Sequence, residues 1–159
     1  MAITRNVNGR EPMIKYSLIA ALVIAIALTV ILIRQARISA QQSPPALQAG
    51  TLAPCGKKPN CVSSAAPTDS DQYIAPISNP GATIQSISAA IEKMGGTTQT
   101  VDGDTLTATF TSALFGFVDD MTVLPDTSAG IFQIRSSSRV GYSDMGANRK
   151  RVEQLRASL

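Results

Sequence analysis

The part of the chain best equipped for binding or catalysis is its last third. Arg135 and Arg139 flank a run of three serines that begins with Ser136. A guanidinium presents planar, paired donors that match a carboxylate, phosphate or sulfate, and serine hydroxyls can complete the shell around such an anion. This run predicts a site for a small anion, and solvated arginines at the end of a strand are the alternative.

Three carboxylates accompany these arginines, at Asp119, Asp120 and Asp144. In a hydrolase, an aspartate can act as acid or base while an arginine stabilises developing negative charge. The sequence has no histidine, and it contains neither a nucleophile elbow nor a phosphate-binding P-loop. A carboxylate-dependent hydrolase is therefore the weakest of three hypotheses, behind a binding module and an anion-binding domain.

A hairpin is expected to bring opposite charges together in this region. The Pro-Asp pair at 125–126 is typical of a turn, and residues 131–137 are predicted to form the return strand. That register would place Asp119 or Asp120 opposite Arg135. The pair is either an ordinary, partly solvated ion pair across the sheet or part of a binding site.

A terminal helix is expected to follow Tyr142, because Ser143 or Asp144 can cap its first turn. Asn148 falls on the apolar side of this helix, and a buried amide requires hydrogen-bond partners. We therefore expect Asn148 to bind either strand backbone or a ligand, with strand backbone favoured. The residues at helical spacing along this side are Met145, Asn148, Val152, Leu155 and Leu159.

These patterns predict one cluster, at the point where the hairpin meets the start of the terminal helix. No metal is expected there, because the chain has no histidine and only two cysteines, and no cofactor is expected either. The residues assigned to ligand or partner binding are Asp119, Asp120, Arg135, Ser136, Arg139, Tyr142, Asp144, Asn148 and Arg149.

The two cysteines, Cys55 and Cys61, enclose a short segment that contains a glycine and a proline. Such a bend brings the thiols together, and one pair of cysteines in an otherwise cysteine-free chain suits an oxidising compartment. A structural disulfide is therefore predicted. A reactive Cys61 is the alternative, because Lys57 and Lys58 are placed to lower the pKa of its thiol.

Upstream of the hairpin, the sequence predicts a helix over residues 80–94 and strands over residues 97–101 and 105–112. Asn79 is the expected N-cap of the helix, and the Asp-Gly pair at 102–103 is typical of a tight hairpin. The order of helix, four antiparallel strands and helix indicates an α+β fold, in which both helices pack on one face of a four-stranded sheet. The other face of the sheet, or the end of it that carries Arg135 and Arg139, is left for binding.

The first third of the chain has a different character. Residues 16–34 contain an uncharged apolar run long enough to cross a bilayer, which predicts a transmembrane helix. A cleaved signal peptide is the alternative, and Arg34 and Arg37 oppose it because cleavage regions are normally uncharged. Residues 35–54 are predicted to form a flexible tether, and residues 55–159 a folded domain.

The charge distribution favours a membrane protein over a nucleic-acid-binding protein. Residues 1–49 contain five basic residues and one acidic residue, whereas the remainder contains nine basic and ten acidic residues. The high pI therefore belongs to the flanks of the apolar run, and no nucleic acid is expected as a partner. Basic residues slightly favour the N-terminal flank. Together with the cysteines, this places residues 1–15 in the cytoplasm and the domain in the periplasm or an equivalent lumen.

Several motifs occur in the order found in one known family. With them, residues 54–159 resemble the domain-of-unknown-function family DUF1499. The resemblance implies an association with bacterial envelopes or plastids, and no established activity. The motifs are Asn60-Cys61-Val62-Ser63-Ser64, Phe115-Gly116-Phe117-Val118-Asp119-Asp120, Arg135-Ser-Ser-Ser-Arg139, and Gly141-Tyr142-Ser143-Asp144 followed by Asn148-Arg149-Lys150-Arg151.

The expected function is a membrane-tethered, extracytoplasmic accessory or binding module that docks on a membrane protein complex of an envelope or a thylakoid. Its apolar helix would contact the lipid bilayer, and its sheet and basic terminal helix would contact the protein partner. The first alternative is a domain that binds a small anion through arginines and serines. The second alternative is the carboxylate-dependent hydrolase.

Overall fold

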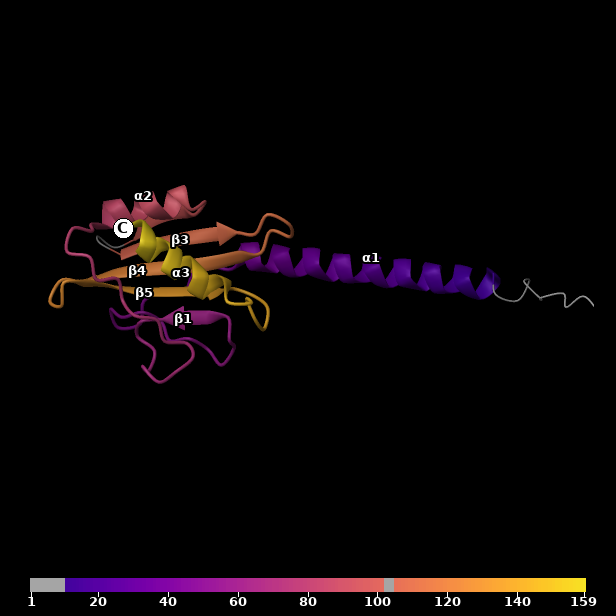
Figure 1. Cartoon of the computed structure of the whole chain (residues 1–159), viewed down its shortest axis with the longest axis horizontal. Coiled ribbons are helices and arrows are strands. Elements are labelled where there is room, and N and C mark those ends of the chain that lie inside the picture. The colour runs from indigo at the N-terminus through magenta and orange to yellow at the C-terminus, as the bar shows by residue number, and fades with distance from the viewer. Residues whose placement is uncertain (1–10, 102–104) are drawn as a thin grey trace, which may run out of the picture.

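A long N-terminal helix leads into an antiparallel sheet that carries two further helices on one face (Figure 1). The computed structural model describes residues 11–101 and 105–159. The predicted Asp-Gly turn at 102–103 and residues 1–10 of the predicted cytoplasmic segment lie outside these ranges. In chain order the elements are α1 (Glu11–Gln41), β1 (Cys61–Ser63), α2 (Ile84–Lys93), β2 (Thr97–Val101), β3 (Thr105–Thr111), β4 (Val118–Asp126), β5 (Ile131–Ser138) and α3 (Ala147–Ser158).

The sheet has five strands in the order β1-β5-β4-β3-β2, and all neighbouring strands are antiparallel. The prediction of four strands was wrong because it missed β1. This strand has three residues, too few to show an alternating pattern in the sequence. It is recognisable only through its pairing with β5, which sets Cys61 opposite Ser137 and Ser63 opposite Arg135.

The hydrophobic core lies between the sheet and the two helices α2 and α3. Alternate residues of a strand point to opposite faces, so that Leu106, Ala108 and Phe110 of β3 share the face that the helices cover. The predicted alternation in β3 and the predicted α+β layering are therefore confirmed. The remaining strands and both helices complete the core with Met121, Val123, Ile134, Ile87, Ile91, Val152 and Leu155.

α2 starts at Ile84, and its N-cap is Thr83 rather than the predicted Asn79. Thr83 Oγ1 accepts a hydrogen bond from the amide of Ser86 at 3.1 Å, and Ser86 Oγ accepts one from the amide of Thr83 at 2.9 Å. This reciprocal capping box satisfies free amides on both sides of the helix start. Asn79 instead closes a local turn by accepting a hydrogen bond from the amide of Gly81.

The hairpin of β4 and β5 has a longer turn than predicted, and this changes its register. The turn spans residues 127–130, and the carboxylate of Asp126 closes it by accepting a hydrogen bond from Ser128 Oγ at 2.7 Å. As a result, Arg135 lies opposite Thr122 and not opposite an aspartate. The predicted cross-strand ion pair was therefore wrong.

The segment predicted as a flexible tether is partly helical and partly laid across the sheet. α1 continues to Gln41, seven residues past the predicted end at residue 34. After α1, residues 44–47 lie beside Thr107 on the face that the helices leave free, and Leu52 is buried. The apolar residues of this segment do not recur at a regular spacing, so the sequence pattern did not predict that they would pack against the sheet.

Candidate functional site

Two polar clusters lie back to back at the end of the sheet where β4 begins and β5 ends. Because successive side chains of a strand point to opposite faces, Asp119 reaches α3 on the helix-covered face while Asp120 points to the other face. For the same reason Ser136 and Ser137 of β5 point to opposite faces. The predicted single cluster is therefore divided by the sheet.

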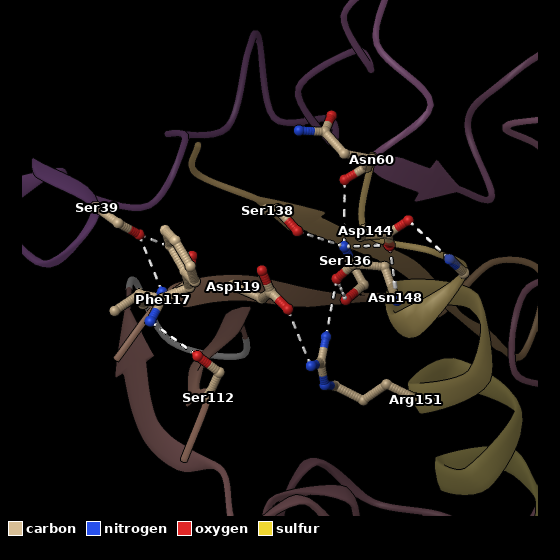
Figure 2. Close-up of polar contacts among 12 residues, drawn as sticks. Ser39, Asn60, Ser112, Phe117, Asp119, Ser136, Ser138, Asp144, Asn148 and Arg151 are labelled. Atoms are coloured by element: carbon tan, nitrogen blue, oxygen red, sulfur yellow. Dashed lines mark hydrogen bonds and ion pairs between the residues drawn. The ribbon is translucent and has the colours of Figure 1, made fainter. Parts of the chain in front are cut away.

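Asn148 is the centre of the cluster on the helix-covered face (Figure 2). Its side chain is fully buried. Its Oδ1 accepts a hydrogen bond from Ser136 Oγ at 2.6 Å, and its Nδ2 donates to the backbone carbonyl of Asn60 at 3.2 Å and to Ser138 Oγ at 3.1 Å. The prediction that Asn148 bonds within the protein is confirmed, with the carbonyl just before β1 as its backbone partner.

Arg151 belongs to this cluster, although the sequence analysis did not single it out as a site residue. Figure 2 shows its guanidinium reaching from α3 toward Asp119 and Asn148, with hydrogen bonds of 3.0 and 2.9 Å. The same guanidinium lies 4.4 Å from the ring centre of Phe110, within the range of a cation–π interaction. Its position three residues after Asn148, on the same side of a helix, was the signal in the sequence.

Asp144 binds backbone amides at the start of α3, although it is not the N-cap of that helix. The N-cap is Gly146, and Asp144 accepts hydrogen bonds from the amides of Gly146 and Asn148 at 3.0 and 2.8 Å. Burial alone would raise the pKa of Asp144, but these hydrogen bonds, with a further one from the Asn148 side chain, hold that pKa below its ordinary value. The predicted caps, Ser143 and Asp144, were thus too early. Met145 is almost wholly exposed and does not join the apolar side of α3.

On the other face, Arg139 forms a two-pronged ion pair with Asp120, with distances of 2.9 and 2.7 Å. The same guanidinium donates to the carbonyl of Ser39, at the end of α1, at 3.1 Å. Ser39 Oγ in turn accepts from the amide of Val118 at 2.9 Å and donates to the Val118 carbonyl at 3.2 Å. We call these four residues, together with the buried Ala36, the anchor joint.

Arg135 lies on this face too, but it forms no ion pair with any residue that the structure describes. Its side chain is buried, and it donates a hydrogen bond to Ser137 Oγ at 2.6 Å, while its Nε has no partner within the described residues. Burial lowers the pKa of Arg135, and the nearby charge of Asp120 opposes that shift. Arg135 is therefore an internal residue of the domain and does not present its guanidinium at an open surface.

The other two predicted site residues lie apart from both clusters. Arg149 donates to the backbone carbonyls of Asp71 and Tyr73, each at 2.7 Å, and so fastens α3 to the loop after β1. Tyr142 is exposed in the loop between β5 and α3. Since Arg149 is on the helix side of the sheet and Arg139 on the other, they cannot close on one small anion.

The predicted disulfide is present. Cys55 and Cys61 are joined, with their Cα atoms 5.7 Å apart. Because both sulfurs are in the bond, neither cysteine is available as the reactive thiol considered as an alternative. The bond ties the start of the domain to β1, the strand that lies next to β5.

A groove of about 430 Å³ runs beside the anchor joint. One wall is residues 40–44, which include the end of α1 and the first residues after it, and the floor is the threonine-rich face of β2 and β3. Arg139 lies at its end. We call it the anchor-side groove, and its main lining residues are Thr97, Gln99, Thr107, Thr109 and Thr111.

The ion pairs of the two clusters hold neighbouring elements of the domain together. Asp119 pairs with Arg151, and Asp120 pairs with Arg139. The Asp120–Arg139 pair is buried, and breaking a buried pair is costly because it leaves an uncompensated charge. The anchor-side groove is an open polar surface next to this pair, where hydroxyl and amide groups are free to form hydrogen bonds.

Comparison with known proteins agrees with the resemblance seen in the sequence. No curated protein matches the chain. Residues 51–159 match a family described as a protein of unknown function, DUF1499. These residues include β1 to β5, α2, α3 and the disulfide, and they leave α1 outside. The chain therefore belongs to the DUF1499 family.

Proposed function

We propose that this protein is a membrane-anchored binding module, which holds its domain in one orientation at a membrane surface and docks there on a membrane protein partner. The observation that carries the proposal is the anchor joint, in which the last turn of α1 is bonded to Val118 and to the Asp120–Arg139 pair. A domain that only had to stay near a membrane would need no such joint, since a flexible linker is sufficient.

The character of α1 supports membrane anchoring. Met13–Gln41 is long and apolar enough to cross a bilayer, and its most apolar part is not covered by the rest of the chain. Side chains such as Leu22 and Ile24 are more than half exposed along it. An apolar surface of this length is stable only when lipid or another protein covers it.

The disulfide supports an extracytoplasmic domain, because such bonds persist in oxidising compartments. We therefore place the domain in the periplasm or an equivalent lumen, with the N-terminus in the cytoplasm. The partner we propose is a membrane protein or complex of a bacterial envelope or a thylakoid, because a domain fixed at the end of its anchor stays next to proteins embedded in the same membrane.

The anchor-side groove is the surface we assign to this partner. It borders α1, so a neighbouring membrane protein would meet it first. The outer edge of β2 lies next to it and has no strand neighbour within the described part of the sheet. A partner can therefore use both the hydroxyl groups of the groove and the free backbone of an edge strand.

Site-specific crosslinking in native membranes tests this assignment. A photoreactive residue at Gln99 or Thr111, both exposed in the groove, should capture one and the same membrane protein. The matched control is Glu153, an exposed position on α3 at the opposite face, which should not capture it. Equal capture from all three positions would contradict the assigned surface.

The role of orientation is tested separately by replacing α1 with a cleavable signal sequence, which releases the domain while keeping its compartment. Release should greatly reduce capture at Gln99 and Thr111. If the released domain captured the partner as efficiently as the anchored one, the fixed orientation would be irrelevant and the proposed function would fail.

A further inference from the structure

We propose that two loops beside α1 insert apolar side chains into the lipid interface. The domain would then contact the bilayer directly, in addition to being attached to it through α1. The loops are residues 112–117, between β3 and β4, and residues 139–146, between β5 and α3, and we call them the membrane-facing loops. This inference rests on the proposed function, because it takes α1 as the membrane span.

The placement of these loops follows from the fold. β3 ends, β4 begins and β5 ends at the same end of the sheet. α1 departs from that end, because Ser39 is bonded to Val118, the first residue of β4. Figure 1 shows both loops on the side of the domain from which α1 extends, and the turn between β4 and β5 at the far side. A membrane crossed by α1 must therefore face these two loops.

The exposed apolar side chains of the domain lie in these same two loops. Apart from α1, the described residues contain three large apolar side chains that are widely exposed, namely Leu114 at 80 %, Tyr142 at 73 % and Met145 at 98 %. Leu114 lies in the first membrane-facing loop, and Tyr142 and Met145 lie in the second. Large apolar groups left in water are unfavourable, and here they gather where a bilayer would cover them.

Both loops are held in conformations that present these side chains outward. In the first, Ser112 accepts hydrogen bonds from the amides of Phe117, through its hydroxyl, and Gly116, through its carbonyl. In the second, the hydroxyl of Ser143 accepts from the amide of Met145 at 3.1 Å. Met145 has a φ of 53°, a left-handed conformation that a methionine adopts only under constraint. Its side chain thus projects from a fixed turn.

The chemistry of these side chains fits the headgroup region rather than the hydrocarbon centre. Tyrosine is enriched at membrane interfaces because its ring is apolar and its hydroxyl remains wet. The exposed Arg34 and Arg37 lie in the last two turns of α1, beside the anchor joint, where their long side chains can reach lipid phosphates. A shallow contact by Leu114, Tyr142 and Met145 is therefore expected.

Tryptophan fluorescence in vesicles tests the inference, because the chain contains no tryptophan of its own. The full-length protein is reconstituted in vesicles of phosphatidylcholine and phosphatidylglycerol, with some lipids brominated either near the headgroup or deep in the acyl chains. Leu114→Trp and Tyr142→Trp report on the two loops independently. Ala129→Trp, in the exposed turn between β4 and β5, is the matched control on the domain, and Ile24→Trp reports on α1.

We expect Leu114→Trp and Tyr142→Trp to emit at shorter wavelength than Ala129→Trp and to lose intensity mainly with the shallow bromines. Ile24→Trp should lose intensity mainly with the deep ones. If Ile24→Trp is quenched while both loop reporters emit as Ala129→Trp does, the loops do not enter the bilayer, and the anchor still stands. If Ile24→Trp is itself unquenched, the proposed membrane span fails, and this inference fails with it.

Discussion

Asn148 shows how one buried amide can join distant parts of a chain. It has no contact with solvent, and its two polar atoms bond to the segment before β1, to β5 and to Asp144. In a buried site these hydrogen bonds specify position as well as contributing stability, because no water is present to replace a lost partner. Its side chain therefore joins β5 and α3 to the segment that leads into β1.

Replacing Asn148 with alanine should therefore lower the free energy of unfolding by about 1–3 kcal/mol, since the hydroxyl of Ser136 is left buried without its partner and the carbonyl of Asn60 loses one of its two donors. Chemical unfolding of the full-length protein in detergent measures the loss. Lys150→Ala, an exposed change in the same helix, should alter stability by less than about 0.5 kcal/mol. Similar losses for the two variants would show that Asn148 has no such role.

Asp144 should make the domain sensitive to acid. The pKa of its carboxyl in the fold lies below its ordinary value of 3.8. The ionised form therefore stabilises the fold at neutral pH, and this contribution is lost as the pH falls through the folded-state pKa. Asp144→Asn should lower Tm at neutral pH, and its Tm should fall less on acidification than that of the unmodified protein.

A control for this acid response is Asp69→Asn, at an exposed position in the loop after β1. It should keep both the neutral Tm and the acid-induced fall. An Asp144→Asn variant whose Tm fell as steeply with acid as that of the unmodified protein would rule out the carboxylate at the start of α3 as a cause of acid sensitivity.

At the level of whole elements, α2 ends where close packing leaves no room for a side chain. Gly96 lies just past the C-cap of α2, and a Cβ atom there would come within 2.6 Å of Ile91 Cγ2 and 2.9 Å of Phe110 Cζ. Both neighbours belong to the core. Gly96 is therefore a point of close contact between helix and sheet.

Gly96→Ala should lower the free energy of unfolding by about 1–3 kcal/mol, because the added methyl group displaces the Ile91 and Phe110 side chains from a packed core. Gly56→Ala is the matched control, since nothing lies within 4 Å of the added methyl group. Thermal unfolding of both variants checks this. A Gly96→Ala protein as stable as the Gly56→Ala protein would mean that the core can expand there without cost.

The elements that could be predicted from the sequence are those with a long apolar run or a periodic pattern. α1 is recognisable from the length of its uncharged apolar run. The side of α2 with Ile87 and Ile91 and the alternation of β3 have the period of their structure. β1 has no such pattern. The start of α2 was missed for another reason, because both Asn79 and Thr83 are suitable N-caps and the helix begins at the one that forms a capping box, Thr83. Local propensity could not choose between these caps.

The predicted binding cluster is divided because neighbouring residues of a strand point to opposite faces, so that Asp119 and Asp120 cannot share one site. Register had a separate effect, since a turn of unexpected length between β4 and β5 moved Arg135 away from the aspartates. Arg139 could be recognised as a candidate for an ion pair, but its contact with Ser39 joins residues a hundred positions apart. No local pattern specifies such a contact.

For the whole molecule, the anchor joint decides how the domain stands relative to its helix. Arg139 can bridge Asp120 and the end of α1 because its guanidinium has donors on several sides. Ser39 completes the joint by using its hydroxyl as both donor and acceptor to Val118, as a strand residue would use its backbone. The joint thus fastens the end of α1 to the backbone of β4.

Asp120→Asn should loosen this joint, because the guanidinium of Arg139 would then lack a counter-charge in a buried place and turn away from Ser39. Spin labels at two introduced cysteines, Gln35→Cys in α1 and Thr127→Cys in the far turn, measure the change as a broader distribution of distances. The native cysteines do not interfere, since they are joined to each other.

Asp119→Asn is the matched control for the joint, because it removes the neighbouring carboxylate, which pairs with Arg151 on the other side of the sheet. It should lower stability and leave the distance distribution narrow. Equal broadening in the two variants would show that the position of the domain depends on the stability of the sheet in general and not on the Asp120–Arg139 pair.

The burial of Ala36 and Ser39 along one side of α1 also fixes on which side of this helix the domain lies. Each residue of an α-helix turns the chain by about 100° and raises it by about 1.5 Å. In the proposed membrane-anchored state, the number of residues between the embedded part of α1 and Ser39 therefore sets the angle between the anchor-side groove and any protein that packs against that embedded part. One inserted residue would turn the groove by more than a quarter of a circle relative to such a protein, without altering any contact inside the domain.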